Sequence, residues 1–327
     1  MKSIFYLSLL IAMLTSCNSS TKKQAEAEAN PLPTVYFTRD ISPESLVRIY
    51  QALGIEATGP VAVKISTGEA GNTHYLKPEL IGALVDSLKG TIVECNTAYA
   101  GQRNSTEAHW QTIRDHGFVP RFTVDLMDEE GSIDIPVVDT THIKLDRVGS
   151  HIERYNFMVN LAHFKGHAMG GFGGVLKNAS IGVASSAGKA YIHSHGMTFD
   201  TIEMWNHIGE QDAFLESMAA AAQAVHNYFA ARGGAVYINV MNNMSVDCDC
   251  DGHPAAPELK DMGIMASTDP VAVDQACLDL VFNHQASEGD NEQALIERIT
   301  SRHGLHTVEH AAAIGLGSRE YQLVEID

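Results

Sequence analysis

The chain has 327 residues, with 40 acidic side chains against 22 lysines and arginines, and its formal net charge is −18. Because such a charge repels nucleic acid, we exclude that class of partner. Hydrophobic residues make up 45% of the chain, enough to bury the core of one large α/β domain or two small ones. The acidic residues are dispersed along the chain, so their simplest role is solubility.

The first 17 residues have the pattern of a bacterial lipoprotein signal. Lys2 provides a positive charge, and residues 4–14 form an apolar segment that is too short to span a bilayer. The sequence Leu14-Thr15-Ser16-Cys17 resembles the lipobox of lipoprotein precursors, which implies cleavage before Cys17 and lipidation of its thiol. The alternative is a secreted protein that is cleaved nearby.

Residues 18–33 are polar, repetitive and interrupted by proline, which favours a flexible stalk before a domain at 34–327. Asn18 follows Cys17, at the position where a retention signal has aspartate. We therefore expect a cell-envelope protein that faces the periplasm, held in the outer membrane by the lipid anchor alone.

From residue 34, apolar strands alternate with amphipathic helices. The pattern predicts strands at 34–38, 61–66, 91–96, 154–163, 235–241 and 321–326. Helices are predicted from Ser42 and from Pro78, and at 106–116, 212–232, 269–282 and 291–302. Residues 118–152 are less regular, and we expect an antiparallel hairpin there. This alternation predicts a single compact α/β unit: a mainly parallel, doubly wound sheet with helices on both faces.

The segment 160–195 is rich in histidine, lysine and glycine, which are not the residue types that fill a hydrophobic core. Histidines and lysines lie where a predicted strand ends, and the glycines at 170–174 let the backbone approach a ligand. The glycine spacing matches neither Walker A nor GxGxxG, so it identifies no nucleotide. The candidates are catalytic His163, Lys177 and His193, and substrate-binding Gly171, Gly173, Gly174 and Asn178. The alternative is that the glycines merely turn the chain and the histidines lie on the surface.

The segment 242–253 combines acids with two of the five cysteines. Cys248 and Cys250 are two apart, which disfavours a disulfide between them. Thiolates with a nearby imidazole suit iron or zinc, so we expect a metal site formed by Cys248, Cys250 and His167. A redox-active thiol pair and a purely structural loop remain alternatives.

A third polar segment follows the strands at 61–66 and 91–96. Glu69 and Asn96 are candidates for substrate binding, with Glu94 beside them; the alternative is that they satisfy loop backbone groups. Since parallel strands end on the same side of a sheet, we expect all three segments to share one rim.

These segments together resemble the family of unknown function called DUF362. The resemblance covers roughly residues 35–325 and rests on KISTGE, VECNTAYAG, HFKGHAMGGFGGVLKN, Gly188-Lys189 with His193, CDCDGHPAAPE and MGIMASTDPVAVDQACLDLV. Many relatives carry a ferredoxin-type insert after the GK…H segment, whereas residues 196–211 here contain no cysteine. We therefore expect no internal iron–sulfur cluster. A remoter likeness is to the lactate racemase family, whose chemistry uses lysine, histidines and a nickel-bearing nucleotide.

The leading hypothesis is a metal-dependent enzyme, of redox or isomerase type, that acts on a small anionic metabolite. Lys177 and the glycine-loop amides would hold the anion, and His163 or His193 would move protons. The rival is a non-catalytic lipoprotein that captures a metal or small ligand. An open polar cleft favours the enzyme, and a closed four-ligand site favours the rival.

Overall fold

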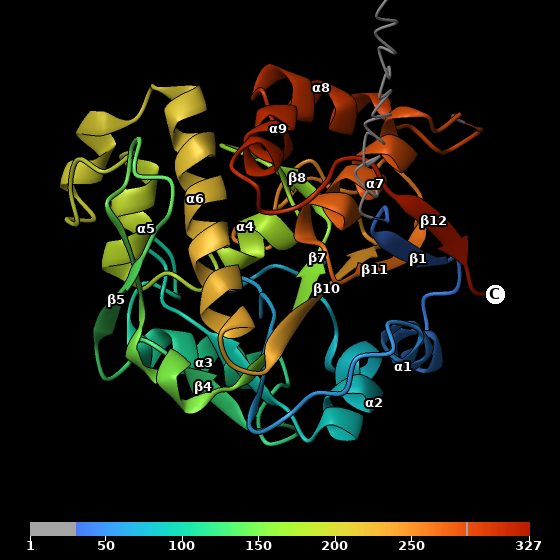
Figure 1. The fold of residues 1–327 in the computed structure, drawn as a ribbon, viewed down its shortest axis with the longest axis horizontal. Coiled ribbons are helices and arrows are strands. Elements are labelled where there is room, and N and C mark those ends of the chain that lie inside the picture. The colour runs from blue at the N-terminus through green and yellow to red at the C-terminus, as the bar shows by residue number, and fades with distance from the viewer. Residues whose placement is uncertain (1–30, 286) are drawn as a thin grey trace, which may run out of the picture. The chain divides into compact units, whose positions relative to one another are not determined.

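The computed structural model describes residues 31–285 and 287–327 (Figure 1). The predicted signal peptide, Cys17 and most of the predicted stalk lie outside these residues. In the described part of the chain, no helix is both long and apolar enough to cross a membrane.

An eight-stranded sheet in the order β12-β1-β11-β10-β7-β2-β3-β4 forms the centre. Every neighbouring pair is parallel except those of β11, which runs antiparallel to β1 and β10. The strands are β1 (Thr34–Thr38), β2 (Val61–Lys64), β3 (Thr91–Glu94), β4 (Val124–Leu126), β7 (Phe157–His163), β10 (Gly234–Met241), β11 (Gly263–Ser267) and β12 (Gln322–Glu325). The carboxyl ends of β2, β3, β7 and β10 therefore meet at one edge.

Helices cover both faces of this sheet, so the predicted doubly wound α/β class is confirmed (Figure 1). On one face, the core contains side chains from α1 (Pro43–Ala52), α2 (Pro78–Leu88) and α3 (Thr106–Asp115). On the other, it contains side chains from α4 (Val175–Ala179), α6 (Gln211–Ala230), α7 (Pro270–Phe282), α8 (Gln293–Ser301) and α9 (Leu305–Ala313). Strand alternation divides the two cores, since Phe157, Val159 and Leu161 of β7 face the first and Met158 and Ala162 face the second.

Two small hairpins complete the fold. Strands β5 (Ser132–Pro136) and β6 (Leu145–Gly149) pair antiparallel, which confirms the hairpin predicted within 118–152. Strands β8 (Lys165–His167) and β9 (Gly171–Gly173) form a second antiparallel pair just beyond the end of β7. Helix α5 (Ser186–His193) packs against α6 and β6.

The differences from the predicted elements have local causes. The strand predicted to start at 154 begins at Phe157, because Ser150–Arg154 forms a 3₁₀ turn. Strand β11 and helices α5 and α9 were not predicted. These three elements have only 5 to 9 residues each, and a periodic pattern of hydrophobic residues is weak evidence over so short a segment.

Candidate functional site

The loops after the parallel strands meet around an open cleft of about 560 Å³. The loops that follow β2, β3, β8 and β10 all line this cleft. The prediction that the three polar segments share one rim of the sheet is therefore confirmed. Its lining includes Glu69, Tyr99, Gln102, His167, Met169, His193, Trp205, Cys248 and Cys250.

Close backbone contacts hold these loops together. A Cβ on Gly166 would lie 2.2 Å from the Val246 carbonyl oxygen, so only glycine lets the cysteine loop pack on β8. The amide of Glu69 donates to the Asp249 carbonyl at 2.8 Å. The amide group of Asn72 donates to the same loop, to the carbonyl of Asp251. The rim is therefore built by main-chain packing and not only by the direction of the strands.

A smaller inner cavity of about 30 Å³ lies beside the cleft, and Cys248 lines both. That volume holds one or two groups the size of a water molecule. The inner cavity is lined by Ser66, Ala162, His163, Lys165, Gly173, Gly174, Lys177, Asn178, Cys248 and Asp249. Several of the sequence-derived candidates therefore gather around a space that accepts the end of a small polar group.

Asp249 joins two cations at the inner cavity. Its carboxylate accepts from Lys165 Nζ at 2.7 Å and lies 3.0 Å from His163 Nδ1. Burial by itself would raise the pKa of Asp249, but the charges of Lys165 and His163 outweigh it and hold that pKa well below its usual range. His163 Nε2 lies 2.5 Å from the Asn242 carbonyl oxygen. Since both partners of the ring are acceptors, the geometry fits a doubly protonated His163 and does not favour its predicted role in moving protons.

A second buried ion cluster surrounds Glu94. Its carboxylate accepts from Lys64 Nζ at 2.9 Å and Arg103 Nη1 at 3.2 Å, and from the Thr67 amide at 2.7 Å. Burial would raise the pKa of Glu94, but Lys64 and Arg103 lower it to about 2. Arg103 Nε also lies 3.5 Å from Glu69 Oε2. Glu69, predicted to bind substrate, thus lines the cleft while orienting Arg103.

Lys177 differs from these paired groups. Its ammonium makes no hydrogen bond and no ion pair with any residue that the structure describes. Burial lowers the pKa of Lys177 to about 8, and the charges of Arg103 and Lys64 act in the same direction. Lys177 lines the inner cavity and is partly exposed, so an anion or a polar oxygen that enters the cavity can pair with its ammonium.

Two neutral histidines face the cleft. His193 Nδ1 donates to the Lys189 carbonyl at 2.7 Å, so its Nε2 keeps the lone pair. Burial lowers the pKa of His193 to about 4, and that of His167 well below its usual range. His167 Nδ1 accepts the Gly170 amide at 2.8 Å, so its Nε2 carries the proton. His193 therefore offers an acceptor to a ligand, and His167 offers a donor.

The expected anion site on the glycine loop is not formed. The first two amides of α4, those of Val175 and Leu176, both donate to the buried carboxylate of Asp274 at 2.9 Å. A Cβ on Gly174 would lie 2.3 Å from Asp274 Oδ1, so this glycine makes room for the chain's own carboxylate. Asp274 also accepts from Asn239 Nδ2 at 2.7 Å. The helix terminus is thus already capped from within the protein.

The expectation that Cys248 and Cys250 do not bond each other is wrong. The structure joins them by a disulfide, with their Cα atoms 5.2 Å apart. A turn in which the Asp251 amide donates to the Cys248 carbonyl at 3.0 Å brings the two side chains to the same side. Donor atoms of His167, Cys248 and Cys250 nevertheless lie within 4.8 Å of one another. The group has the donors of a soft-metal site only when the disulfide is reduced.

The remaining candidates hold the loops. Asn178 lines the inner cavity, but its amide group donates to the Lys64 carbonyl and to Asn160 Oδ1. Asn96 lines neither cavity, because Thr106, His109 and Asp128 occupy its polar atoms. A Cβ on Gly171 would lie 2.9 Å from Gly304 Cα, so this glycine serves packing against the turn before α9.

Sequence reasoning missed several buried polar and charged groups of the site. Lys64 and Asn160 are buried polar residues within otherwise apolar strands, VAVK and FMVNLAH. Because a polar side chain does not contribute to the packing of an apolar strand, a polar residue within such a strand indicates a specific polar contact. Arg103 and Asp274 had no comparable signal, since one lies in a loop and the other within a helix.

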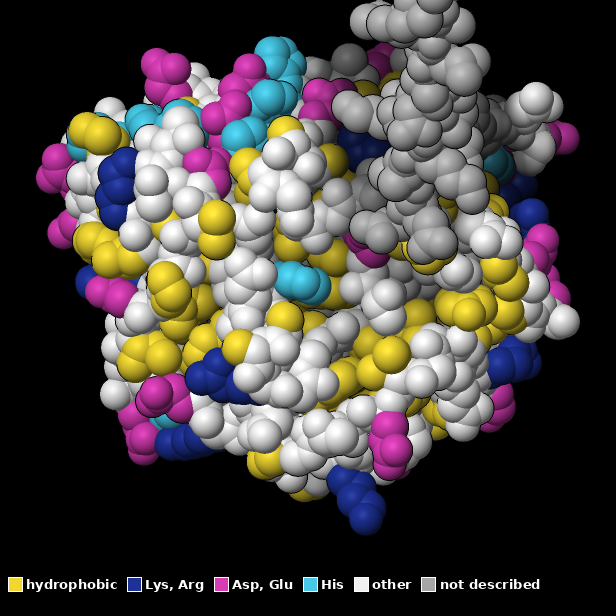
Figure 2. Space-filling view, in the orientation of Figure 1, with side chains coloured by type: hydrophobic (Ala, Val, Ile, Leu, Met, Phe, Trp, Pro, Cys, Tyr) yellow, Lys and Arg dark blue, Asp and Glu magenta, His cyan; other side chains and the backbone are white. Residues whose placement is uncertain are grey.

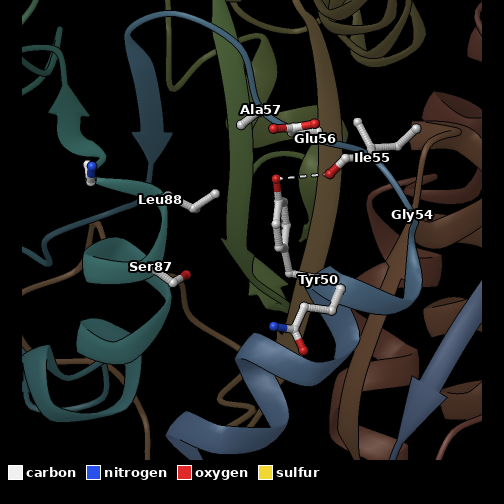
Figure 3. Close-up of a pocket in the computed structure, with 9 residues that line it drawn as sticks. Tyr50, Gly54, Ile55, Glu56, Ala57, Ser87 and Leu88 are labelled. Atoms are coloured by element: carbon white, nitrogen blue, oxygen red, sulfur yellow. Dashed lines mark hydrogen bonds between the residues drawn. The ribbon is translucent and has the colours of Figure 1, made fainter.

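A separate hollow of about 620 Å³ lies at the opposite edge of the sheet, before β2 and beyond the ends of α1 and α2 (Figure 3). Tyr50 points into it and donates to the Ile55 carbonyl at 3.1 Å. Its charged lining residues are Glu56 and Lys89. With no gathering of titratable side chains, this hollow is not our candidate site.

No curated protein matches the chain in sequence. The lactate racemase apoprotein from Thermoanaerobacterium thermosaccharolyticum aligns at 14% identity over 75% of this chain, with a TM-score of 0.44. A protein from Thermotoga maritima aligns at 13% identity over 72% of this chain, also with a TM-score of 0.44. This chain spans 56% and 57% of the lengths of those two proteins.

The sequence pattern of one family matches most of the region that forms the cleft. The match covers residues 61–279, from β2 to α7, and so contains the three rim segments and both buried ion clusters. The chain therefore belongs to the family described as "Domain of unknown function (DUF362)".

Proposed function

We propose that the protein is an enzyme that binds a small organic anion in the inner cavity and cleft. The observation that carries this proposal is the ammonium of Lys177, which has no partner among the described residues and lines a cavity large enough for the end of a carboxylate. At the inner cavity, the side chains of Lys165 and Lys177 stand against the single carboxylate of Asp249. In a protein of net charge −18, this local excess of positive charge favours an anion.

The side chains that face a bound anion suit proton transfer. Lys177 would hold one end of the anion, while the Nε2 lone pair of His193 would accept a proton from the part that extends into the cleft. His167 would donate a hydrogen bond from its Nε2. The open cleft and the three donor atoms of the cysteine group support an enzyme rather than a carrier with a closed four-ligand metal site.

A soft metal, iron or zinc, is part of this proposal only for the reduced protein. The thiolates of Cys248 and Cys250 would hold it together with an imidazole nitrogen of His167, because donor atoms of these three residues lie within 4.8 Å of one another. Such a metal would polarise a substrate oxygen. Anion binding by Lys177 does not depend on it.

We place this activity in the cell envelope, with the chain anchored through lipidated Cys17 in the outer membrane and facing the periplasm. The lipobox pattern at residues 14–17 supports this proposal. The Cys248–Cys250 disulfide supports it too, because disulfides persist in oxidising compartments and are rare in the cytosol.

The direct test is calorimetric titration of the purified protein with acetate, glycolate, succinate and inorganic phosphate. We expect at least one of these anions to bind, and Lys177→Met to weaken its affinity by about 10–100-fold, as befits the loss of a charge-assisted hydrogen bond. Lys89→Met is the matched control, since Lys89 is an exposed lysine beside the hollow at the other edge. Equal affinities of Lys177→Met and Lys89→Met for these anions would refute the assignment of Lys177. The absence of binding of all four anions by the wild type would refute it too.

A further inference from the structure

A second group of metal-ligating side chains lies outside the cleft and the inner cavity, on the surface between α6 and α9. Figure 2 shows histidine and acidic side chains gathered on the face where Figure 1 places these helices. We call it the outer histidine cluster: Asp139, His142, Glu216, His306 and His310. Glu216 belongs to α6, His306 and His310 belong to α9, and the other two precede β6. None of these residues lines the cleft or the inner cavity.

Glu216 is the centre of this cluster. Its two oxygens lie 2.7 Å from His142 Nε2 and 2.9 Å from His306 Nε2. His310 Nε2 lies 2.8 Å from Asp139 Oδ2, and its Nδ1 lies 3.8 Å from Glu216 Oε1. Three imidazoles thus converge on two carboxylates, drawn from three separate parts of the chain.

The spacing on α9 explains the convergence. His306 and His310 are four residues apart on one helix, so their rings lie on the same face, with centroids 6.1 Å apart. Donor atoms of Glu216, His306 and His310 all lie within 4.8 Å of one another. Imidazole and carboxylate together suit zinc and its first-row neighbours, whereas calcium and magnesium prefer oxygen alone.

Charge and orientation also fit a divalent ion. Each of the three rings directs Nε2 at a carboxylate oxygen, so an ion seated among them would replace protons that the rings now donate. The proton of His306 would move to Nδ1, which lies 3.9 Å from Glu309 Oε2. A carboxylate behind a ligating imidazole is the usual outer partner at such sites. Two carboxylates would balance the charge of one divalent ion.

The cluster is open to solvent on one side. The His306 side chain is 30% exposed and that of His310 is 17% exposed, so an ion can enter and keep water as a ligand. His306 also lines a surface hollow of about 340 Å³ together with Asp212, Thr300, His303, Gly304, Leu305 and Glu309. The simpler role is a set of hydrogen bonds that pins α9 to α6. That role requires no convergence of three rings and gives no metal affinity.

We propose that Glu216, His306 and His310 form a binding site for one divalent transition-metal ion, with His142 and Asp139 as further ligands or outer partners. The site is independent of the cysteines and of the proposed anion site.

The test is titration of the full chain with zinc chloride alone, with the protein purified in detergent, free of chelator and without a polyhistidine tag. The protein is kept oxidised, so that Cys248 and Cys250 stay in their disulfide. We expect one zinc ion per chain, and a loss of affinity of more than about 100-fold in His306→Gln/His310→Gln, because outer partners alone change metal affinity by about 10–100-fold. His207→Gln is the matched control, since His207 pairs with Glu203 at the same four-residue spacing but has no third partner in the described chain.

Cobalt chloride provides a second measurement that does not depend on the variants. Binding of cobalt in the wild type should give a visible absorption band of four- or five-coordinate ions, displaced by one equivalent of zinc. Absence of zinc binding in the wild type, or unchanged affinity in the double variant, would overturn the proposal. A spectrum identical to that of cobalt chloride in buffer, which indicates water ligands alone, would also overturn it.

Discussion

The inner cavity and the outer histidine cluster contain the same types of side chain, histidine beside a carboxylate, but they differ in how deeply these side chains are buried. At the inner cavity, His163, Lys165 and Asp249 are almost fully buried, and these three side chains pair with one another. In the outer cluster, His306 and Glu216 remain 30% and 22% exposed. A buried charge is tolerated only when it is paired, so the pairs of the cleft act as fixed electrostatics. The partly exposed pairs of the outer cluster can exchange a proton for a metal ion with a smaller loss of hydration energy.

The largest expected effect is on the free energy of unfolding, and it distinguishes a buried ion pair from an exposed one. Asp249→Ala leaves the cations of Lys165 and His163 buried without their carboxylate, and we expect a loss of about 3–5 kcal/mol in the free energy of unfolding. Asp134→Ala removes the exposed partner of Arg147 and should change that free energy by less than about 1 kcal/mol. Urea denaturation of the two variants measures both values. Equal losses would show that burial does not distinguish these ion pairs.

The fold was predictable because its signals are local. Pro43, Pro78 and Pro270 each begin a helix where the sequence places them, and the apolar run before His163 is a central strand. Strand direction then fixes the rim on which the polar loops meet. Strand β11 was missed, because nothing in its five residues marks a strand that reverses direction between two parallel neighbours.

The site was predictable in its residue types but not in its contacts. His163, Lys177, Cys248 and His193 do line the cleft or the inner cavity. Their partners are distant in sequence: Asp274 lies 99 residues from the Val175 amide that it accepts. Such long-range pairing decides which helix terminus is capped, and no local pattern reveals it.

The two clusters should also differ in how they respond to reductant. With the disulfide intact, the proposed zinc site is the outer histidine cluster, whereas reduction adds the thiolates of Cys248 and Cys250. We therefore expect reduction to raise the zinc content of the wild type by about one equivalent per chain, since a soft thiolate pair binds zinc well. Elemental analysis before and after reduction measures this increment.

The matched control is Cys248→Ser/Cys250→Ser, in which reduction should add nothing, while the buried thiols of Cys95 and Cys277 are unchanged. An increment of the same size in this variant would remove the cysteines from the metal site. No increment in the wild type would show that the reduced cysteines bind no zinc.

The most direct test of the central claim is the pH dependence of anion affinity in the wild type and in Lys177→Met. The pKa of Lys177 is lowered to about 8, so its ammonium is present below that pH and lost above it. We expect the wild-type affinity to be constant from pH 6 to 7 and to fall by about tenfold per unit above pH 8, until it meets that of Lys177→Met. A difference between the two proteins that persists undiminished at about pH 10, or an affinity that does not fall above pH 8, would contradict the account.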